Sequence, residues 1–200
     1  YAAYGQAFKA PTFSQLFGSY GYSGNLDLLP ERATTYELGV NQVWGAAKMH
    51  WAAFRTLVDD EIVYTNMNDN ASKTRRDGYT LDGVSPVTEV FSVRGAYTYT
   101  KARIVEYQTG TKDFAGYAVP QVPEHTYQLG CVYSPDRLTL AVDHVFVGAQ
   151  YVNSDFYNEM PTLRPYQYTD VHAKCQLTSD WSLFADVYNL FNNRYCDYAL

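Results

Sequence analysis

The side chains that could do chemistry are four histidines, three cysteines and scattered carboxylates, and their spacing forms no catalytic or metal-binding motif. Asp143 and His144 are neighbours in a strand-like segment, so they point to opposite faces and cannot pair as base and orienting group. The Gly21–Gly24 segment, GYSG, lacks the spacing of a G-x-S-x-G nucleophile turn. Only His172 shares a face with a nearby carboxylate, Asp170, whereas a metal site needs several converging ligands. We therefore predict no enzyme activity, no metal site and no cofactor.

The composition favours a β-rich membrane protein. The chain contains 20 tyrosines, which favour strands and suit the interface between a membrane and water. Mean hydropathy is -0.33, and no apolar run approaches the ~18 residues that a membrane-spanning helix needs. A barrel strand alternates between lipid and a polar lumen, so it is not hydrophobic in bulk. The net charge of -6 argues against a nucleic-acid partner, whose binding surface would be basic.

Alternation of apolar and polar side chains predicts about nine strands. We place them at residues 1–8, 34–44, 47–58, 76–84, 89–103, 124–133, 137–150, 166–177 and 181–191. The long connections, including polar loops at 9–33 and 59–75, all fall at one end of these strands. This asymmetry is typical of a transmembrane β-barrel, which has short periplasmic turns and longer extracellular loops. The predicted fold is all-β, an antiparallel meander from an outer-membrane β-barrel.

One face of the predicted strands is too charged for a packed core, which indicates a hydrated lumen or contact with a plug. Its ionisable residues are Glu37, Lys48, His50, Asp82, Arg94, Asp143, Asp170, His172, Lys174 and Asp186. The opposite face, with Leu129, Leu140 and Val171, is assigned to lipid. Arg55 and His144 also fall on that face. We expect Arg55 to lie near the membrane interface, and we have no explanation for His144.

Several segments resemble the TonB-dependent outer-membrane receptors. Phe8–Thr12, FKAPT, is similar to the family's FRAPT box, and LPE at 29–31 with TYELGV at 35–40 is similar to its NPNLKPE…YELG segment. DVYNLFNNRY at 186–195 is similar to a motif near the family's C-terminus. The resemblance implies an N-terminal plug and a barrel of about 22 strands. Residues 1–200 are therefore expected to be a partial barrel domain, with the plug and the last strand absent.

The resemblance also implies a function, which is energy-coupled uptake of a scarce ligand across the bacterial outer membrane. A ferric siderophore is the expected ligand, with cobalamin or another TonB-coupled substrate as the alternative. The implied partners are the receptor's own plug, TonB and outer-membrane lipid. Residues 9–29 contain no histidine, which weighs against haem. Three alternatives come from other functional classes. They are a passive porin, an outer-membrane barrel enzyme and a soluble all-β binding protein.

Aromatic side chains in the long connections are the candidate ligand contacts, because aromatic rings offer large contact areas to a bulky ligand. The candidates are Phe13, Phe17, Tyr20, Tyr22, Tyr117 and Tyr157. Further aromatics occur nearby in the same connections, at Tyr107, Phe114, Tyr151 and Phe156. Ordinary packing within the loops is the alternative role for all of them. We predict that the longest connection, 9–33, captures ligand.

Overall fold

A computed structural model describes residues 1–19, 23–64, 68–109, 111–153 and 155–198. Nine of its strands form one antiparallel sheet in the order β1-β2-β3-β4-β5-β8-β9-β10-β11, so the predicted meander is confirmed. Their bounds are β1 Ala2–Lys9, β2 Glu31–Trp44, β3 Ala47–Tyr64, β4 Asn68–Pro86, β5 Phe91–Glu106, β8 His125–Tyr133, β9 Leu138–Val147, β10 Tyr166–Gln176 and β11 Ser182–Val187.

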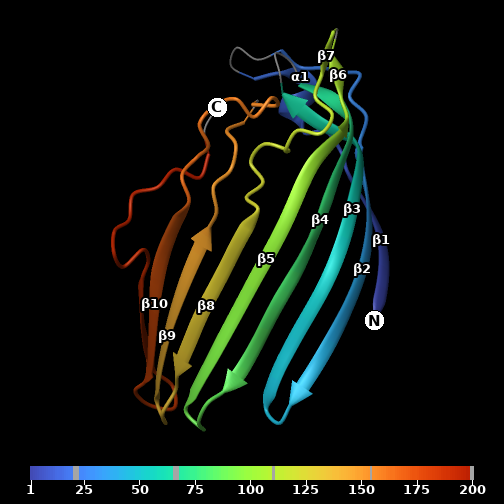
Figure 1. The fold of residues 1–200 in the computed structure, drawn as a ribbon. Helices are drawn as coiled ribbons and strands as arrows, with labels where there is room; N and C mark the ends of the chain where they lie inside the picture. The colour runs from blue at the N-terminus through green and yellow to red at the C-terminus, as the bar shows by residue number, and fades with distance from the viewer. Residues whose placement is uncertain (20–22, 65–67, 110, 154, 199–200) are drawn as a thin grey trace.

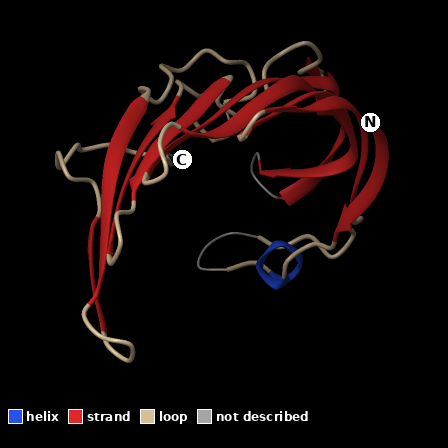
Figure 2. Ribbon diagram, turned by 90° about the horizontal axis from the view of Figure 1, so that it is seen from below, coloured by secondary structure: helices blue, strands red, loops and turns tan. Residues whose placement is uncertain are grey.

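The sheet is curved and its connections differ at the two ends (Figures 1 and 2). Tight turns join strands at one end, such as the Trp44–Ala47 turn, in which Gly45 adopts a φ of 59°. The other end carries the helix α1 (Phe13–Phe17) and a small hairpin of β6 (Gln108–Thr109) and β7 (Lys112–Asp113). The predicted asymmetry is therefore present. Among the described residues, no helix has the length and apolar character to cross a membrane.

The predicted loop at 59–75 is wrong, because β3 and β4 continue through it as a paired hairpin that reaches Tyr64 and Asn68. Polar contacts across the strands replace apolar alternation there. The Arg76 guanidinium lies 2.6 Å from Glu61, which also accepts a hydrogen bond from the Thr74 hydroxyl. At 18 residues and about 3.3 Å per residue, β3 is roughly 60 Å long, well beyond a ~30 Å hydrocarbon core.

Two other expectations need correction. The connection after β1 contains α1, although the whole segment was expected to be loop. The last strand, expected to run to residue 191, ends at Val187. Just beyond it, Asn189 takes a φ of 50° and donates its backbone N–H to Asp170 at 2.8 Å. That left-handed conformation is one that asparagine tolerates better than most residues, and it stops the ladder.

Cross-strand register confirms the two predicted faces. Residues directly opposite each other share a face, and His50 faces Asp82 while His172 faces Asp186. Each of these histidines lies within hydrogen-bond distance of its carboxylate, at 2.8 and 2.7 Å. The ten ionisable residues predicted to share a face therefore do gather on one side, which we call the polar face. Leu129 is 55% exposed on the opposite, apolar face.

The two polar residues predicted on the apolar face both have partners there. Arg55 Nε donates to Asp77 Oδ1 at 2.5 Å, directly across the β3–β4 ladder. His144 Nδ1 lies 2.9 Å from the hydroxyl of Thr169, which faces it from β10. A polar group that faces hydrocarbon needs a partner within the protein, and Thr169 supplies one for His144. The hydrogen bond to Thr169 supplies the role that the sequence left open for His144.

Aromatic rings form a band across the apolar face. Tyr4 packs on Tyr36 with ring centroids 5.4 Å apart, Tyr79 lies 5.3 Å from Tyr99, and Tyr127 stacks on Phe146 at 4.8 Å. Along β4, Tyr79 lies two residues from Asp77 toward the short-turn end. Aromatic girdles mark the membrane–water interfaces of outer-membrane barrels. The band therefore places the lipid-facing region of these strands between it and the short turns.

Candidate functional site

The first aromatic group lies on α1. Thr12 caps this helix, because its hydroxyl accepts the Gln15 N–H at 3.3 Å while the Gln15 side chain accepts the Thr12 N–H at 2.8 Å. Phe13 and Phe17 are one helical turn apart, with ring centroids separated by 4.5 Å. They are 77% and 59% exposed. Figure 2 shows α1 on the concave side of the sheet, so this pair lies over the interior of the arc.

Hydrogen bonds fasten residues 10–30 to the outer ends of β3 and β4. The Asn70 side chain accepts the Leu29 N–H at 2.9 Å and donates to the Leu29 carbonyl at 3.0 Å. It also donates to the Asp60 carbonyl at 2.6 Å. Asn25 donates its side-chain amide to the Asn68 carbonyl at 3.0 Å. The described residues around Asn25 and Leu29 are therefore held close to the two strands.

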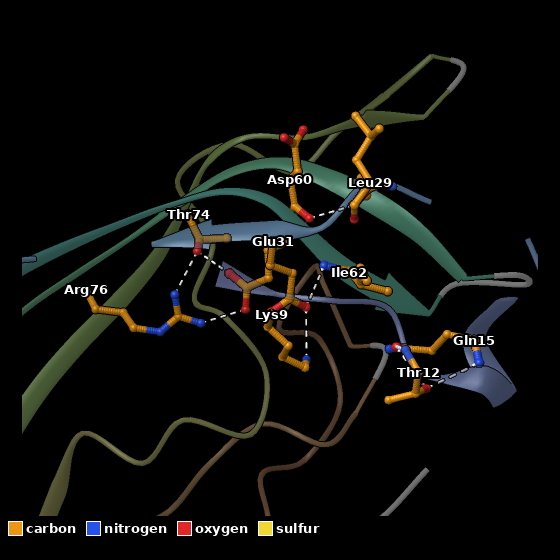
Figure 3. Close-up of polar contacts among 11 residues, drawn as sticks. Lys9, Thr12, Gln15, Leu29, Glu31, Asp60, Ile62, Thr74 and Arg76 are labelled. Carbon is orange, nitrogen blue, oxygen red and sulfur yellow. Dashed lines mark hydrogen bonds and ion pairs between the residues drawn. The ribbon is translucent and has the colours of Figure 1, made fainter. Parts of the chain in front are cut away.

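The two segments that carried the resemblance meet at the base of this connection. Lys9 Nζ lies 3.0 Å from Glu31 Oε1, and the same oxygen accepts the Ile62 N–H at 3.1 Å (Figure 3). Lys9 and Glu31 are direct partners at the ends of β1 and β2. Thr12 then begins the capping box of α1 three residues later. The two sequence boxes thus form one structural unit that closes the connection and positions α1.

The second aromatic group joins the β5–β8 connection to the β9–β10 connection. Tyr107, Phe114 and Phe156 are buried against one another, with ring centroids 5.0 to 5.8 Å apart. The Ala118 N–H donates to the Asn158 side chain at 2.7 Å, which adds a second link. The three buried rings therefore pack the loops together and are not available as ligand contacts.

Tyr117 and Tyr157 lie at the edge of this packed cluster. Their rings meet edge to face at 5.6 Å, and Tyr157 also lies 4.7 Å from Phe114. Lys112 Nζ is 5.9 Å from the centre of the Tyr157 ring. Sequence reasoning did not single out Lys112, since only the folded β6–β7 hairpin brings it to this ring. The arrangement offers a partly exposed aromatic surface beside a cation.

The structure does not unite all six predicted contacts in one place. Phe13 and Phe17 form one group, Tyr117 and Tyr157 form another, and no ring contact joins the two groups within the described residues. Tyr20 and Tyr22 lie outside the described residues.

A third aromatic group was missed by the sequence analysis. Tyr195 stacks on Tyr166 with ring centroids 4.4 Å apart and on Tyr168 at 5.9 Å. The signal in the sequence was the spacing of Tyr166 and Tyr168, which places both on one face of β10. That face is the one that carries Asp170 and His172.

The polar face carries charges that are largely paired with one another. Arg94 donates two hydrogen bonds from Nη2 to Asp143, each 2.7 Å long, and Asp143 is buried. Tyr1 donates its hydroxyl to Glu37 at 2.6 Å and lies 2.8 Å from His50 Nε2. A depression of 430 Å³ lies between β2 and β8, and its lining includes Asn41, Lys48, His50, Asp82, Arg94 and Gln128. Within the described ranges, no three His, Cys, Asp or Glu side chains are placed to hold a metal ion.

Residues 1–190 match the family model described as the β-barrel of TonB-dependent receptor-like proteins. This chain belongs to the TonB-dependent receptor family. It is 27% identical over 187 residues to the catecholate siderophore receptor Fiu of Escherichia coli K12, a match that covers 89% of the chain and 24% of Fiu. It is 25% identical over 193 residues to the ferric-pyoverdine M114 receptor PbuA of Pseudomonas, covering 89% of the chain and 23% of PbuA. The chain thus spans about a quarter of these relatives.

Solved receptor structures share the fold. The closed form of Fiu from E. coli K12 superposes with a TM-score of 0.70 at 24% identity, covering 98% of this chain and 29% of that one. The ferric yersiniabactin uptake receptor FyuA of Yersinia pestis gives a TM-score of 0.72 at 21% identity, with 98% and 30% coverage. The copper transporter OprC gives 0.73 at 19% identity, with 98% and 31% coverage. These likenesses establish the barrel architecture of the nine-stranded sheet.

Proposed function

We propose that this chain forms part of the barrel wall of an outer-membrane receptor. The receptor would import a ferric siderophore with energy supplied through TonB. The observation that carries the proposal is the concentration of accessible aromatic rings at the long-connection end of a barrel sheet. The names of its relatives Fiu and PbuA, which are a catecholate siderophore receptor and a ferric-pyoverdine receptor, support the ligand class. The separation of a charged face from an exposed apolar face supports a location in the outer membrane.

In this proposal the described residues capture ligand at the rim. Phe13 and Phe17 offer two exposed rings on the concave side, and Tyr117 and Tyr157 offer a second contact surface. Tyr20 and Tyr22 are proposed to contribute from the same connection as α1. Lys112 adds a positive charge beside Tyr157, which suits an anionic chelate with aromatic groups. Capture would then rest on stacking and hydrogen bonding as well as on charge.

The polar face has a separate part in this proposal. Its paired charges and its 430 Å³ depression give a plug a hydrated, hydrogen-bonding wall to contact. Since Arg94 and Asp143 already satisfy each other, a plug could move against this wall without exposing a buried unpaired charge. TonB would supply the energy for that movement. The wall itself would stay rigid because every strand between the two edge strands, β1 and β11, is paired on both sides.

The test is uptake of a ⁵⁵Fe-labelled siderophore by cells that express the full-length receptor, with surface binding measured in parallel. The Phe13→Ala/Phe17→Ala variant is expected to bind ligand about 5- to 30-fold more weakly, as for loss of central aromatic contacts. Trp181→Ala is the matched control, since Trp181 is exposed at the opposite end of the sheet. Both variants are compared at equal receptor abundance.

Two results would contradict the proposal. Binding by Phe13→Ala/Phe17→Ala as tight as that of the parent would remove the α1 surface from the capture site. Uptake that continues at the same rate in cells without TonB would indicate a passive porin.

A further inference from the structure

The apolar face contains a groove where β3, β4, β5 and β8 lie side by side. Gly83 and Gly95 are direct partners across the β4–β5 ladder and form its floor. The groove has a volume of 400 Å³, and its apolar walls are Met49, Leu81, Tyr97, Tyr127 and Leu129. These wall residues alternate with the charged residues of the same strands, so the groove opens on the lipid side of the sheet.

Only glycine keeps this floor open. A Cβ at Gly83 would lie 3.0 Å from the backbone oxygen of Lys48, and one at Gly95 would lie 3.3 Å from Leu129 Cδ2. Larger side chains at these positions would fill the groove. Leu129 and Leu81 are 55% and 40% exposed at its edges, so their methyl groups have no protein partners on the open side. An apolar occupant would supply the missing dispersion contacts.

A group of cations lies on the same face, two residues beyond Tyr79 and Tyr99 of the aromatic band and in register with its Tyr36. Arg55, Arg75 and Lys101, which we call the cation cluster, surround the single carboxylate of Asp77. Arg55 and Arg75 contact Asp77 at 2.5 and 2.9 Å, and Lys101 faces it across the β4–β5 ladder. Arg103 faces Arg75 across the same ladder and donates to the Gly116 carbonyl at 2.6 Å. The next outward pair, Lys73 with Glu106 at 3.6 Å, is neutral as a unit. The cluster therefore carries two positive charges in excess of its carboxylate, and both arginines are exposed.

The distance between the groove and the cation cluster is similar to the thickness of one hydrocarbon leaflet of a bilayer. From Lys101, the wall residue Tyr97 is four residues along β5 and the floor residue Gly95 is six, which corresponds to about 13–20 Å. Half of a bilayer's hydrocarbon core is about 15 Å thick. A headgroup at the cation cluster would thus place the far part of its acyl chain over the glycine floor.

We propose that this face binds one membrane lipid with an anionic, phosphate-bearing headgroup. The phosphate contacts the cation cluster, and an acyl chain lies in the groove over Gly83 and Gly95. Charge complementarity selects a lipid rather than a second copy of the chain, since two cation clusters brought together would repel. The inference rests on the proposed membrane location, and it is independent of which ligand the receptor imports.

The experiment uses the full-length receptor in phosphatidylcholine nanodiscs that contain a minority of phosphatidylglycerol with identical acyl chains. Native mass spectrometry measures the lipid retained after release, and a diazirine on the phosphatidylglycerol tail maps its contacts by photocrosslinking. The parent protein is expected to retain phosphatidylglycerol preferentially and to crosslink at Tyr127 or Leu129.

The variants separate the two parts of the site. Lys101→Gln is expected to lower the phosphatidylglycerol preference about fivefold, whereas Lys48→Gln, a cation of the polar face, leaves it unchanged. Gly95→Leu is expected to abolish the groove crosslinks, whereas Ala173→Leu, which introduces the same side chain elsewhere on the apolar face, preserves them. A Cβ at Gly95 would have a flexible side-chain atom as its nearest neighbour and the closest backbone atom, the Gln128 oxygen, at 3.9 Å, so this variant is expected to be better tolerated than one at Gly83.

Equal retention of phosphatidylcholine and phosphatidylglycerol would overturn the proposal, as would the same crosslinking in Gly95→Leu and Ala173→Leu. Either result would mean that this face contacts only the bulk lipid around the barrel. Receptor-to-receptor crosslinks through the groove would overturn it in favour of a second copy. Siderophore uptake measured on the same variants distinguishes the two proposals. Selective lipid retention by a receptor that imports no siderophore would refute the proposed function alone.

Discussion

Replacing Val142 with arginine tests the assignment of faces. Val142 lies near the middle of β9, between Cys131 of β8 and Val171 of β10, and it is 36% exposed on the apolar face. An arginine at the midplane of a barrel's lipid face costs about 2–4 kcal/mol. That cost corresponds to a roughly 30- to 900-fold loss in the folding equilibrium. Ala141→Arg is the matched control, since the adjacent residue points to the polar face and should lose about 1 kcal/mol or less.

The assay is equilibrium urea unfolding of the full-length receptor in lipid vesicles, followed by tryptophan fluorescence. Both variants add the same side chain to the same strand, so differences in charge and in helix or strand propensity largely cancel. Equal losses for Val142→Arg and Ala141→Arg would refute the assignment of Val142 to lipid and Ala141 to the lumen. A larger loss for Ala141→Arg would reverse the two faces.

Three further substitutions test individual residues. Arg94→Ala should destabilise the receptor by about 1–3 kcal/mol in the same unfolding assay by leaving the buried carboxylate of Asp143 unpaired, and adding Asp143→Asn should recover most of that loss. Thr12→Ala should cost α1 about 1 kcal/mol, seen as faster hydrogen exchange at residues 13–18, whereas Thr12→Ser should preserve protection. Tyr20→Ala with Tyr22→Ala should weaken ligand binding by about 1–2 kcal/mol per ring at unchanged abundance, and parental affinity would exclude both from the capture site.

The fold could be predicted from the sequence wherever a strand faces lipid. In β8, Tyr127, Leu129 and Cys131 alternate with polar or small residues, and their register agrees with that alternation. The signal is strong because hydrocarbon on one side and water on the other impose opposite demands on successive residues. The same contrast between lipid and water predicted that Asp143 lies on the polar face.

The sequence pattern failed where strands leave the bilayer. Beyond Val58 the β3–β4 hairpin is mostly polar, and its apolar residues Ile62 and Val63 are consecutive, so apolar and polar residues do not alternate and the segment resembles a loop. The left-handed backbone of Asp60 also turns Glu61 toward Arg76 on the polar face, against simple alternation. In contrast, α1 was predictable from the Thr12-x-x-Gln15 capping pattern, which was overlooked.

For the candidate site, the sequence predicted the type of side chain, which is aromatic, but not which of these side chains are accessible. Tyr107, Phe114 and Tyr157 look alike in the sequence, and only the packing of two connections divides them into buried and accessible rings. The contact between Lys112 and Tyr157 depends on a hairpin of two short strands that has no periodic signal. The pairing of Tyr195 with Tyr166 joins residues far apart in the chain, which no local pattern reveals.

The way Asn70 holds the connection after β1 has an evolutionary consequence. Its side chain bonds to the N–H and carbonyl of Leu29 and to the carbonyl of Asp60, and none of these groups depends on a side chain. The connection can therefore exchange its own side chains, including Phe13 and Phe17, without losing this attachment. Ligand preference could then diverge among related receptors, while the barrel wall and the hydrogen bonds that attach this connection to it stay the same.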